Sequence, residues 1–446
     1  MSLAREELSA VFLGSSKPAK HIGVEIEIAP LRPDTGRSTP YEGNAGVRAL
    51  LERFQQLSGG TLIFDGDNPV GVALQDGNGS VVLENGGAIE LCSAPAPELV
   101  SLHGRVEATL RVLAQAGRAV GIALVPGANF PFNAIDSFNW MPKRYGKSLR
   151  EYFASLGEQG EAGSLAMSHI TSTQTTLDYD SEGEAAEMVR TGVALIPVVT
   201  ALFANSPLEA GMVCGALSRR TQYFFKSDPD RFGFVPPALD ANFGLQEFID
   251  WALDFRMIYR KQKDGAIVSV RRSFRDLMRN GFSDGEAATL EDWKQHLSQI
   301  YTDVRLRDTI ELRGADGPAY AHIMTVPAFW VGLLYHKPSR DAVWARLGDY
   351  TLATLRDARE EAATKGLKGM VGGTAMRELA SEVVGWARKG LEARIARGLE
   401  SAEAAAYLDP IEEVAARGET FAERCLVLWQ GELQQSPAKY VCHFCI

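Results

Sequence analysis

Two glutamates stand two positions apart in an otherwise apolar segment near the N-terminus, residues 21–28. The alternation predicts a β-strand whose apolar residues face a core, while Glu25 and Glu27 face the other way. Side chains two residues apart on one strand face lie about 7 Å from each other. The segment therefore predicts a pair of neighbouring carboxylates, although one such strand is also compatible with a solvated surface.

Two further segments carry acids in positions that can join this pair. In residues 83–91, Glu84 stands at a turn and Glu90 on a strand, and the intervening Gly86-Gly87 permits a tight fold between them. In residues 308–316, Glu311 and Arg313 share one face of a third predicted strand.

A fourth predicted strand, residues 168–179, is unusually polar on one face. That face holds Ser168, Ile170, Ser172, Gln174, Thr176 and Asp178. The pattern is compatible both with a sheet that lines a ligand site and with an exposed edge strand.

Together, the strands can place five carboxylates on one concave sheet face, where they would repel one another unless they bound cations. The five are Glu25, Glu27, Glu84, Glu90 and Glu311. Oxygen ligands without a histidine or cysteine cluster select Mg²⁺ or Mn²⁺, and nearby arginines hold phosphate or carboxylate groups. This is the chemistry of a metal-bridged ATP site built on a sheet. Phosphate-binding loops, dinucleotide fingerprints, nucleophile elbows and zinc-helix motifs are absent from the sequence.

The elements around these strands predict an α+β fold, with a curved antiparallel sheet lining the site and helices packed around it. Helices are expected over residues 97–115 and 184–205, the second kinked at Pro197. The second half is expected to be mostly helical, interrupted by one strand near residues 308–316. With no repeat or low-complexity linker, the chain is expected to be a single domain, 1–446, mostly helical from about residue 320.

Composition narrows the partners and the compartment. A net charge of −10 over 446 residues argues against nucleic acid. The longest apolar stretch, residues 193–204, falls short of the roughly 18 residues that span a bilayer, so no membrane partner is expected. The N-terminus lacks a signal pattern, which favours a cytoplasmic protein. Five dispersed cysteines do not suggest a disulfide framework, and the terminal pair Cys442/Cys445 leaves a redox pair or partial metal site open.

Several segments, taken in order, resemble the plant and proteobacterial type of glutamate–cysteine ligase, which catalyses the first step of glutathione synthesis. The resemblance runs from about residue 20 to 435 and is strongest over residues 201–207, 312–317 and 327–335. Residues 205–231 also follow the family in order and spacing. The resemblance implies a fold related to the catalytic domain of glutamine synthetase, ATP as co-substrate, and Mg²⁺ or Mn²⁺.

The same resemblance implies roles for individual residues. The five glutamates match metal ligands, with Glu27 also in a catalytic role, and Gln174 matches a residue beside the same metal centre. Arg220 matches a group that grips the glutamate substrate, and Arg313 one that contacts the transferred phosphate. Asp230 and Arg231 match a charged loop beside the site, and Arg231 is expected to contact substrate.

The implied reaction has two steps: the glutamate γ-carboxylate attacks the γ-phosphorus of ATP, and an amine then displaces phosphate from the acyl phosphate. The sequence departs from the family at Ile26, Asn85, Thr175-Thr176 and residues 318–320. These departures bear on the amine more than on the reaction class. The expectation is cysteine as acceptor and a monomer or homodimer. A ligase for another amine, a phosphotransferase that stops at the acyl phosphate, and a non-catalytic binding protein remain alternatives.

Overall fold

The computed structural model describes residues 3–13 and 20–446. Within them, one antiparallel sheet of nine strands has the order β14-β15-β7-β1-β5-β4-β3-β2, and β6 pairs with the second half of β1. Its strands are β1 (Ile22–Leu31), β2 (Thr61–Asp65), β3 (Asn68–Ala73), β4 (Gly79–Leu83), β5 (Ile89–Ser93), β6 (Ala123–Pro126), β7 (Thr173–Leu177), β14 (Val304–Leu306) and β15 (Ile310–Leu312).

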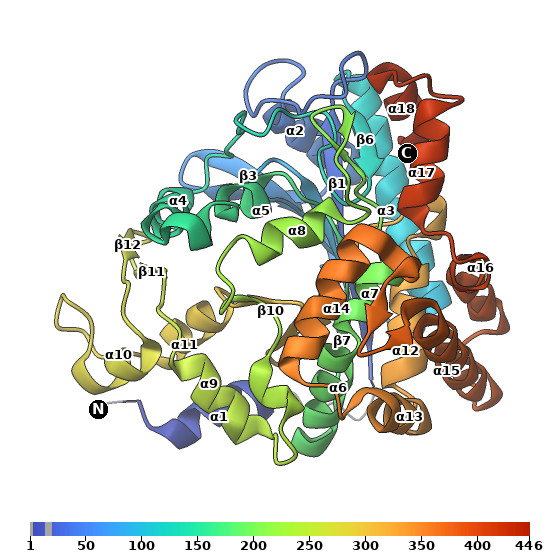
Figure 1. The fold of residues 1–446 in the computed structure, drawn as a ribbon. Helices are drawn as coiled ribbons and strands as arrows, with labels where there is room; N and C mark the ends of the chain where they lie inside the picture. The colour runs from blue at the N-terminus through green and yellow to red at the C-terminus, as the bar shows by residue number, and fades with distance from the viewer. Residues whose placement is uncertain (1–2, 14–19) are drawn as a thin grey trace.

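The two faces of this sheet differ in chemistry because side chains alternate along each strand. Ile26, Leu91 and Val81 are aligned across β1, β5 and β4 and are buried. This apolar face packs on helices α2 (Val47–Ser58), α3 (Leu99–Ala119), α6 (Glu182–Ala194) and α12 (Thr325–Leu334). Figure 1 shows the sheet nearly edge-on with α3 and α12 on one side.

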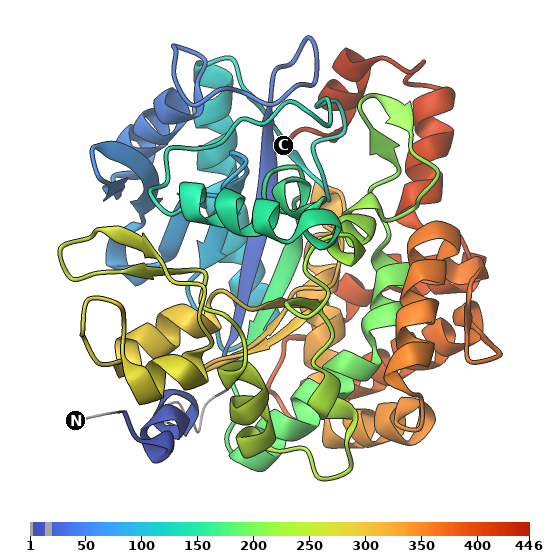
Figure 2. The same cartoon turned by 60° about the vertical axis from the view of Figure 1, so that its left-hand side comes forward.

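The other face of the sheet is covered by shorter elements that leave space above it. In Figure 2 they surround the middle of the sheet from the front. They are α4 (Gly146–Ser155), α5 (Gly163–Ser168), α8 (Arg219–Phe225), β10 (Phe232–Gly233), α9 (Leu245–Leu253), β11 (Tyr259–Lys261), β12 (Ile267–Ser269), α10 (Phe274–Asn280), α11 (Leu290–Leu297) and β13 (Tyr301–Thr302).

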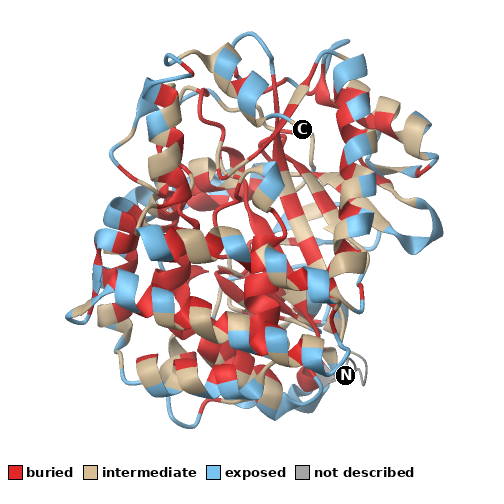
Figure 3. Cartoon of the chain, turned by 90° about the vertical axis from the view of Figure 1, so that its right-hand side faces the viewer, coloured by how far each residue is buried: buried red, intermediate tan, exposed pale blue. Residues whose placement is uncertain are grey.

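Helix α7 and the helices of the C-terminal part complete the core behind the sheet. They are α7 (Ile196–Phe203), α13 (Lys337–Leu347), α14 (Leu352–Lys365), α15 (Met376–Ala396), α16 (Asp409–Arg417), α17 (Phe421–Gln430) and α18 (Pro437–Phe444). Helices α12 and α15 cross at Gly332 and Gly390, where a Cβ would meet opposing backbone within 2.1 Å. Figure 3 shows buried residues along the inner faces of these helices and on the sheet. One hydrophobic cluster runs from Leu8 to Phe421, and the single domain expected from the sequence stays a prediction.

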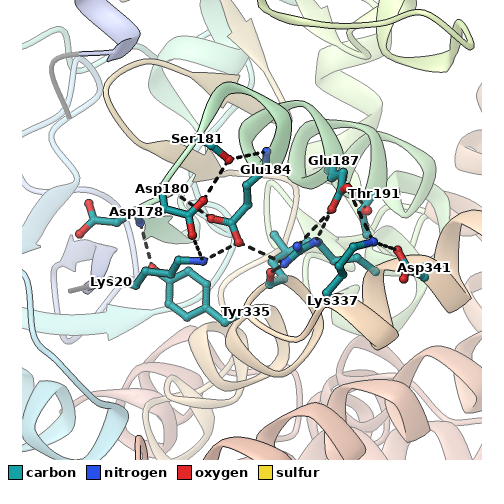
Figure 4. Close-up of polar contacts among 12 residues, drawn as sticks. Lys20, Asp178, Asp180, Ser181, Glu184, Glu187, Thr191, Tyr335, Lys337 and Asp341 are labelled. Carbon is teal, nitrogen blue, oxygen red and sulfur yellow. Dashed lines mark hydrogen bonds and ion pairs between the residues drawn. The ribbon is translucent and has the colours of Figure 1, made fainter. Parts of the chain in front are cut away.

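The tyrosine at the end of α12 ties together the two strands that carry the polar side chains. Tyr335 donates its hydroxyl to the His21 carbonyl, 2.6 Å away, and accepts the backbone N–H of Asp178 at 2.9 Å. These contacts fix the start of β1 against the end of β7, and therefore the register between the strands (Figure 4).

A network of charges continues from the same point to α6 and α13. The Lys20 ammonium lies 3.3 Å from the Asp180 carboxylate and 2.5 Å from that of Glu184, which also pairs with Arg340 at 3.4 Å. Figure 4 shows Lys20, Asp180 and Glu184 pointing toward one another. Because Glu184 and Arg340 are mostly buried, each needs its partners to remain charged.

The predicted α+β class with an antiparallel sheet is confirmed. The predicted helices correspond to α3 and to the pair α6–α7, which bends by 56° around Leu195, just before Pro197. Two predictions need correction. The strand expected over residues 168–179 extends only over Thr173–Leu177, because Ser168 ends helix α5. The second half contains several short strands besides β15, each of two or three residues and too short to give a period-two pattern.

Among the described residues, no single helix is long and apolar enough to cross a membrane. The bent pair α6–α7 reaches that length and composition only when its two helices are joined.

Candidate active site

The strand register places the predicted acids of β1, β5 and β15 on the open face of the sheet. Glu27 on β1 lies opposite Glu90 on β5, and Glu25 lies opposite Gln174 on β7. Glu84 joins them from the turn after β4, where its backbone N–H donates to the Ala88 carbonyl at 2.8 Å.

Two glycines make that turn possible. Gly87 has φ +94°, a conformation that side chains disfavour, and a Cβ on Gly86 would lie 1.9 Å from the Ser168 carbonyl. The predicted role of the Gly-Gly pair in folding Glu84 back toward Glu90 agrees with this geometry.

Above these acids lies a cavity of about 350 Å³. Among the described residues its walls contain as many arginines as glutamates: Glu25, Glu27, Glu84, Glu90, Arg220, Arg305, Arg307 and Arg313. The glutamates on the sheet side of the cavity therefore face several arginines. This arrangement suits a substrate that carries anionic groups held together with cations.

The carboxylates of the sheet wall are hard to ionise when nothing else is bound. Burial and the neighbouring Glu84 raise the pKa of Glu27 to about 7, although Arg220 and Arg313 oppose the rise. Burial first and neighbouring glutamates second also raise the pKa of Glu25 and that of Glu90. A bound cation would relieve this repulsion.

Gln174 connects the negative and positive walls. Its amide nitrogen donates to Glu27 at 3.1 Å, and its amide oxygen accepts from Arg313. Ser172 donates a second hydrogen bond to Glu27 at 3.0 Å. The polar face predicted for β7 therefore faces the cavity and orients the reactive side chains.

Arg220 enters the cavity from α8 and is 2% exposed. It donates to the backbone carbonyls of Arg313 at 2.6 Å and Gly314 at 3.3 Å, and lies 3.8 Å from Asp316. Its Nε is buried with no hydrogen-bond partner among the described residues. A held guanidinium with a spare donor fits the predicted grip on a substrate carboxylate.

Glu311, the fifth predicted metal ligand, lies opposite Thr176 on β7 and is surrounded by three arginines. It is 1% exposed and contacts Arg305 at 2.5 Å, Arg307, and Arg313 at 3.5 Å. Burial alone would raise the pKa of Glu311, but the three arginines outweigh it and lower that pKa to about 2. The Glu311 carboxylate does not line the cavity and holds the three arginines that do. Its role as a metal ligand stays a prediction.

Arg305 and Arg307 are functional candidates that the sequence reasoning missed. Both line the cavity, and Arg305 lies directly opposite Glu311 across the β14–β15 ladder. Their signal is the spacing Arg305-Leu306-Arg307 before the Glu311 strand, which places two cations on the same strand face.

Arg231, which was expected to contact substrate, does not line the active-site cavity. Its donors are used by the backbone carbonyls of Gln299 at 2.6 Å and Arg256 at 2.7 Å, and by the Asp228 carboxylate at 3.2 Å. With 1% exposure, it braces the loop after α8. Neither it nor Asp230 reaches the site predicted for substrate.

The residues facing the cavity suit Mg²⁺ when phosphate is also bound. No three His, Cys, Asp or Glu side chains within residues 3–13 and 20–446 converge closely enough to hold an ion alone. Mg²⁺ commonly uses one or two carboxylates and completes its shell with water and substrate phosphates. Glu25 and Glu90 have no ion pair with any described residue, and both offer oxygen ligands on the cavity side.

A second cavity of about 460 Å³ adjoins the first and shares Tyr145, Tyr259 and Ser298 with it. The rings of Tyr145 and Tyr259 stack at 5.1 Å and 13°. Lys143 lies in its wall, 3.7 Å from Glu84. Burial lowers the pKa of Lys143, but Glu84 and Tyr145 outweigh burial and the net shift is upward. Lys143 and Tyr145 lie on a loop without periodicity, so the sequence offered no signal for them.

The departures from the family pattern lie in different places. Ile26 is fully buried on the core face, and Thr175 is also buried there, opposite Leu312. Tyr320 is 38% exposed. Asn85 alone among these four lines the active-site cavity, and its buried Oδ1 has no partner among the described residues.

Comparison with known proteins gives a match over almost the whole chain. A model of glutamate–cysteine ligase family 2 matches residues 21–439. The chain is 33% identical over 441 residues to glutamate–cysteine ligase B, chloroplastic, of Oryza sativa subsp. japonica, covering 97% of this chain and 86% of the rice protein. It is 34% identical over 442 residues to the chloroplastic glutamate–cysteine ligase of Nicotiana tabacum, covering 97% and 81%.

The fold has a counterpart among solved structures. The glutamate–cysteine ligase of Francisella tularensis in complex with AMP aligns with a TM-score of 0.60 at 10% identity, covering 96% of this chain and 89% of that protein. At this identity the likeness concerns the fold alone, and it confirms the predicted fold class.

One prediction is overturned by the relatives. The rice and tobacco enzymes are named as chloroplastic, as is that of Arabidopsis thaliana, which contradicts the expected cytoplasmic location. The composition and core packing of a chain reflect the requirements of folding. Its cellular compartment depends instead on targeting signals that a receptor recognises.

The matches confirm the predicted family and the predicted glutamate–cysteine ligase activity. The extent of the family model and an identity above 30% over nearly the full chain leave one assignment: this chain belongs to glutamate–cysteine ligase family 2.

Proposed function

We propose that the 350 Å³ cavity binds glutamate, ATP and Mg²⁺ and forms γ-glutamylcysteine through a γ-glutamyl phosphate. One observation carries this proposal: four glutamates of the sheet face arginines across a single cavity. Such a site neutralises both a triphosphate and a carboxylate nucleophile, which otherwise repel each other.

Arg220 holds the glutamate substrate in this proposal. Its side chain is fixed by two backbone carbonyls and Asp316, while its Nε remains free to donate. A guanidinium held this way binds a carboxylate without losing further rotamer freedom. The γ-carboxylate is then free to approach the phosphate.

The arginines held by Glu311 receive the phosphates. Arg313 contacts both Gln174 and Glu311, and burial lowers the pKa of Arg305 to about 10, so both remain cationic at neutral pH. They stabilise negative charge as the γ-carboxylate oxygen bonds to the γ-phosphorus and ADP departs.

Glu25, Glu27, Glu84 and Glu90 are the residues that would hold Mg²⁺ on the opposite side of the phosphates. When bound there, Mg²⁺ supplies charge neutralisation and fixes the geometry of the phosphate chain. Gln174 and Ser172 keep the Glu27 oxygens turned toward the cavity, which positions this ligand before substrate arrives.

The adjoining 460 Å³ cavity is the proposed place for the nucleotide base. Its wall combines the stacked Tyr145–Tyr259 pair with the apolar side chains of Phe64, Val70 and Val82. Aromatic and aliphatic walls suit a planar base. Lys143 lies between this wall and Glu84, where a cation can contact the phosphates.

In the second step the cysteine nitrogen attacks the acyl carbon, phosphate leaves, and the nitrogen loses a proton. The acceptor is tested by phosphate release with glutamate, ATP and Mg²⁺ and a panel of amines. We expect rapid release only with cysteine, together with a ligated product. Release with another amine instead would reassign the acceptor, release without any amine would indicate a phosphotransferase, and no release would indicate a binding protein.

Asn85 provides a sharper test of the acceptor side. It is the cavity-lining departure from the family turn, where proline is usual. We expect Asn85→Pro to keep glutamate-dependent phosphate transfer and to change the ratio of kcat/KM between cysteine and other amines. An unchanged ratio would remove Asn85 from acceptor recognition.

A further inference from the structure

The loop that contains Asp230 and Arg231 lines a separate cavity of about 400 Å³. This cavity lies between α4, α9, α14 and the loop before β10, whose positions Figure 1 shows. Phe232 follows Arg231 directly and lines the active-site cavity. The two cavities are therefore separated by the chain segment at the start of β10.

Part of the charge around this cavity is already paired. Arg231 and Asp228 lie 3.2 Å apart, and Tyr152 donates its hydroxyl to Asp228 at 2.5 Å. Asp254 lies 2.6 Å from Arg275. These groups form the wall and have little charge left for a ligand.

Three charged side chains in the same wall are not paired. Arg256, Arg356 and Asp230 are exposed, and their side chains make no ion pair or hydrogen bond with any residue in the described ranges 3–13 and 20–446. The unpaired groups are therefore two guanidinium groups and one carboxylate. A ligand with complementary charges would carry two carboxylates and one ammonium group.

Apart from Gln159, the remaining wall is mainly apolar and aromatic. Trp251 and Phe255 pack edge to face with centroids 4.7 Å apart at 84°, and Leu156 and Pro236 complete this side. Such a surface covers the aliphatic part of a small molecule while polar groups fix its ends.

We propose that this cavity binds a small acidic amino acid or γ-glutamyl dipeptide, with its carboxylates on Arg256 and Arg356 and its ammonium on Asp230. Glutamate and γ-glutamylcysteine both have this charge pattern. The choice of these two molecules rests on the proposed function, whereas the pattern itself rests on the cavity.

Calorimetric titration of the full-length protein with glutamate and, separately, with γ-glutamylcysteine tests the proposal. We expect two binding sites in the wild type for at least one of the two ligands, and one site in the double variant Arg256→Ala/Arg356→Ala. Arg220→Ala, which alters the active-site cavity, should retain the second site. The matched control Arg111→Ala/Arg118→Ala removes two exposed arginines of α3 and should keep both sites.

If the double variant loses the second site for only one of the two molecules, that molecule, the amino acid or the dipeptide, is the ligand of this cavity. Binding with one site in the wild type, or equal stoichiometry and affinity in wild type and double variant, would overturn the proposal. Turnover of the double variant at saturating substrates should stay within about twofold of wild type, because neither arginine lines the active-site cavity. A wild type without turnover would count against the proposed function, whereas the second site is judged by binding alone.

Discussion

Replacing Gln174 by methionine should separate the two charged walls of the active site while preserving the volume of the side chain. The amide now donates to Glu27 at 3.1 Å and accepts from Arg313. Methionine has similar length and can make neither hydrogen bond, so Glu27 is left with Ser172 and Arg313 with Glu311, and no hydrogen bond among the described residues connects the two groups. Gln174 is 2% exposed, and water has little access to substitute for it.

The size of the effect follows from the two lost bonds. A hydrogen bond to a charged group contributes about 1.5–3 kcal/mol. If both bonds position groups that act in the transition state, the loss totals about 3–6 kcal/mol, or roughly two to four orders of magnitude in kcat. Because Gln174 acts through its neighbours, kcat should fall more than the KM for glutamate rises.

The assay is ADP release with glutamate, cysteine, ATP and Mg²⁺, accompanied by thermal unfolding to confirm that the variant folds. Thr175→Val is the matched control: it lies next to Gln174 on β7 but faces the core, and its hydroxyl has no partner among the described residues. We expect near-normal turnover from the control. A folded Gln174→Met enzyme with kcat within threefold of wild type would refute the positioning role.

Further predictions concern the acid wall, the nucleotide side and a buried histidine. Glu27→Gln should abolish ligation, yet unfold at an equal or higher temperature without ligands, because it removes a carboxylate whose pKa burial raises to about 7; a lower melting temperature would contradict this. Lys143→Met leaves Glu84 without its 3.7 Å cation partner and should reduce kcat/KM for ATP at least tenfold, measured at saturating glutamate and cysteine. His296 is fully buried, and burial lowers its pKa to about 3. Below about pH 6.5 the unfolded chain binds a proton that the folded chain does not, so stability falls as pH falls, by about 2 kcal/mol between pH 7 and pH 5. Urea unfolding of His296→Phe should show a smaller loss over that range, and an equal slope would refute the assignment.

The sheet and its acidic face were predictable because apolar and polar residues alternate along a strand wherever only one face of the sheet is buried. In β1, alternation placed Glu25 and Glu27 on one face, and the strand register then set them beside Glu90 and Gln174. The fold class followed from such segments together with the long amphipathic helix α3.

The parts that escaped prediction depend on contacts between segments distant in sequence. Lys143 and Tyr145 lie on a loop, and only the folded chain brings them to Glu84 and Tyr259. Arg231 has the composition of a binding residue, but the backbone carbonyls that use its donors lie 25 and 68 positions away in the sequence. No local pattern distinguishes a bracing arginine from a substrate-binding one.

Glu311 illustrates why residue type and spacing were insufficient within the sheet itself. In both Glu25-x-Glu27 and Glu311-x-Arg313, charged residues alternate with apolar ones along a strand, so the two segments look alike in the sequence. The residues opposite Glu27 and Glu311 on the neighbouring strands nevertheless differ. Glu27 lies opposite another acid, Glu90, and burial together with the nearby Glu84 raises its pKa to about 7. Glu311 lies opposite Arg305, and that pairing, reinforced by Arg313, consumes its charge. The register therefore places one carboxylate beside another acid and the other beside an arginine, a difference that the sequence pattern alone does not show.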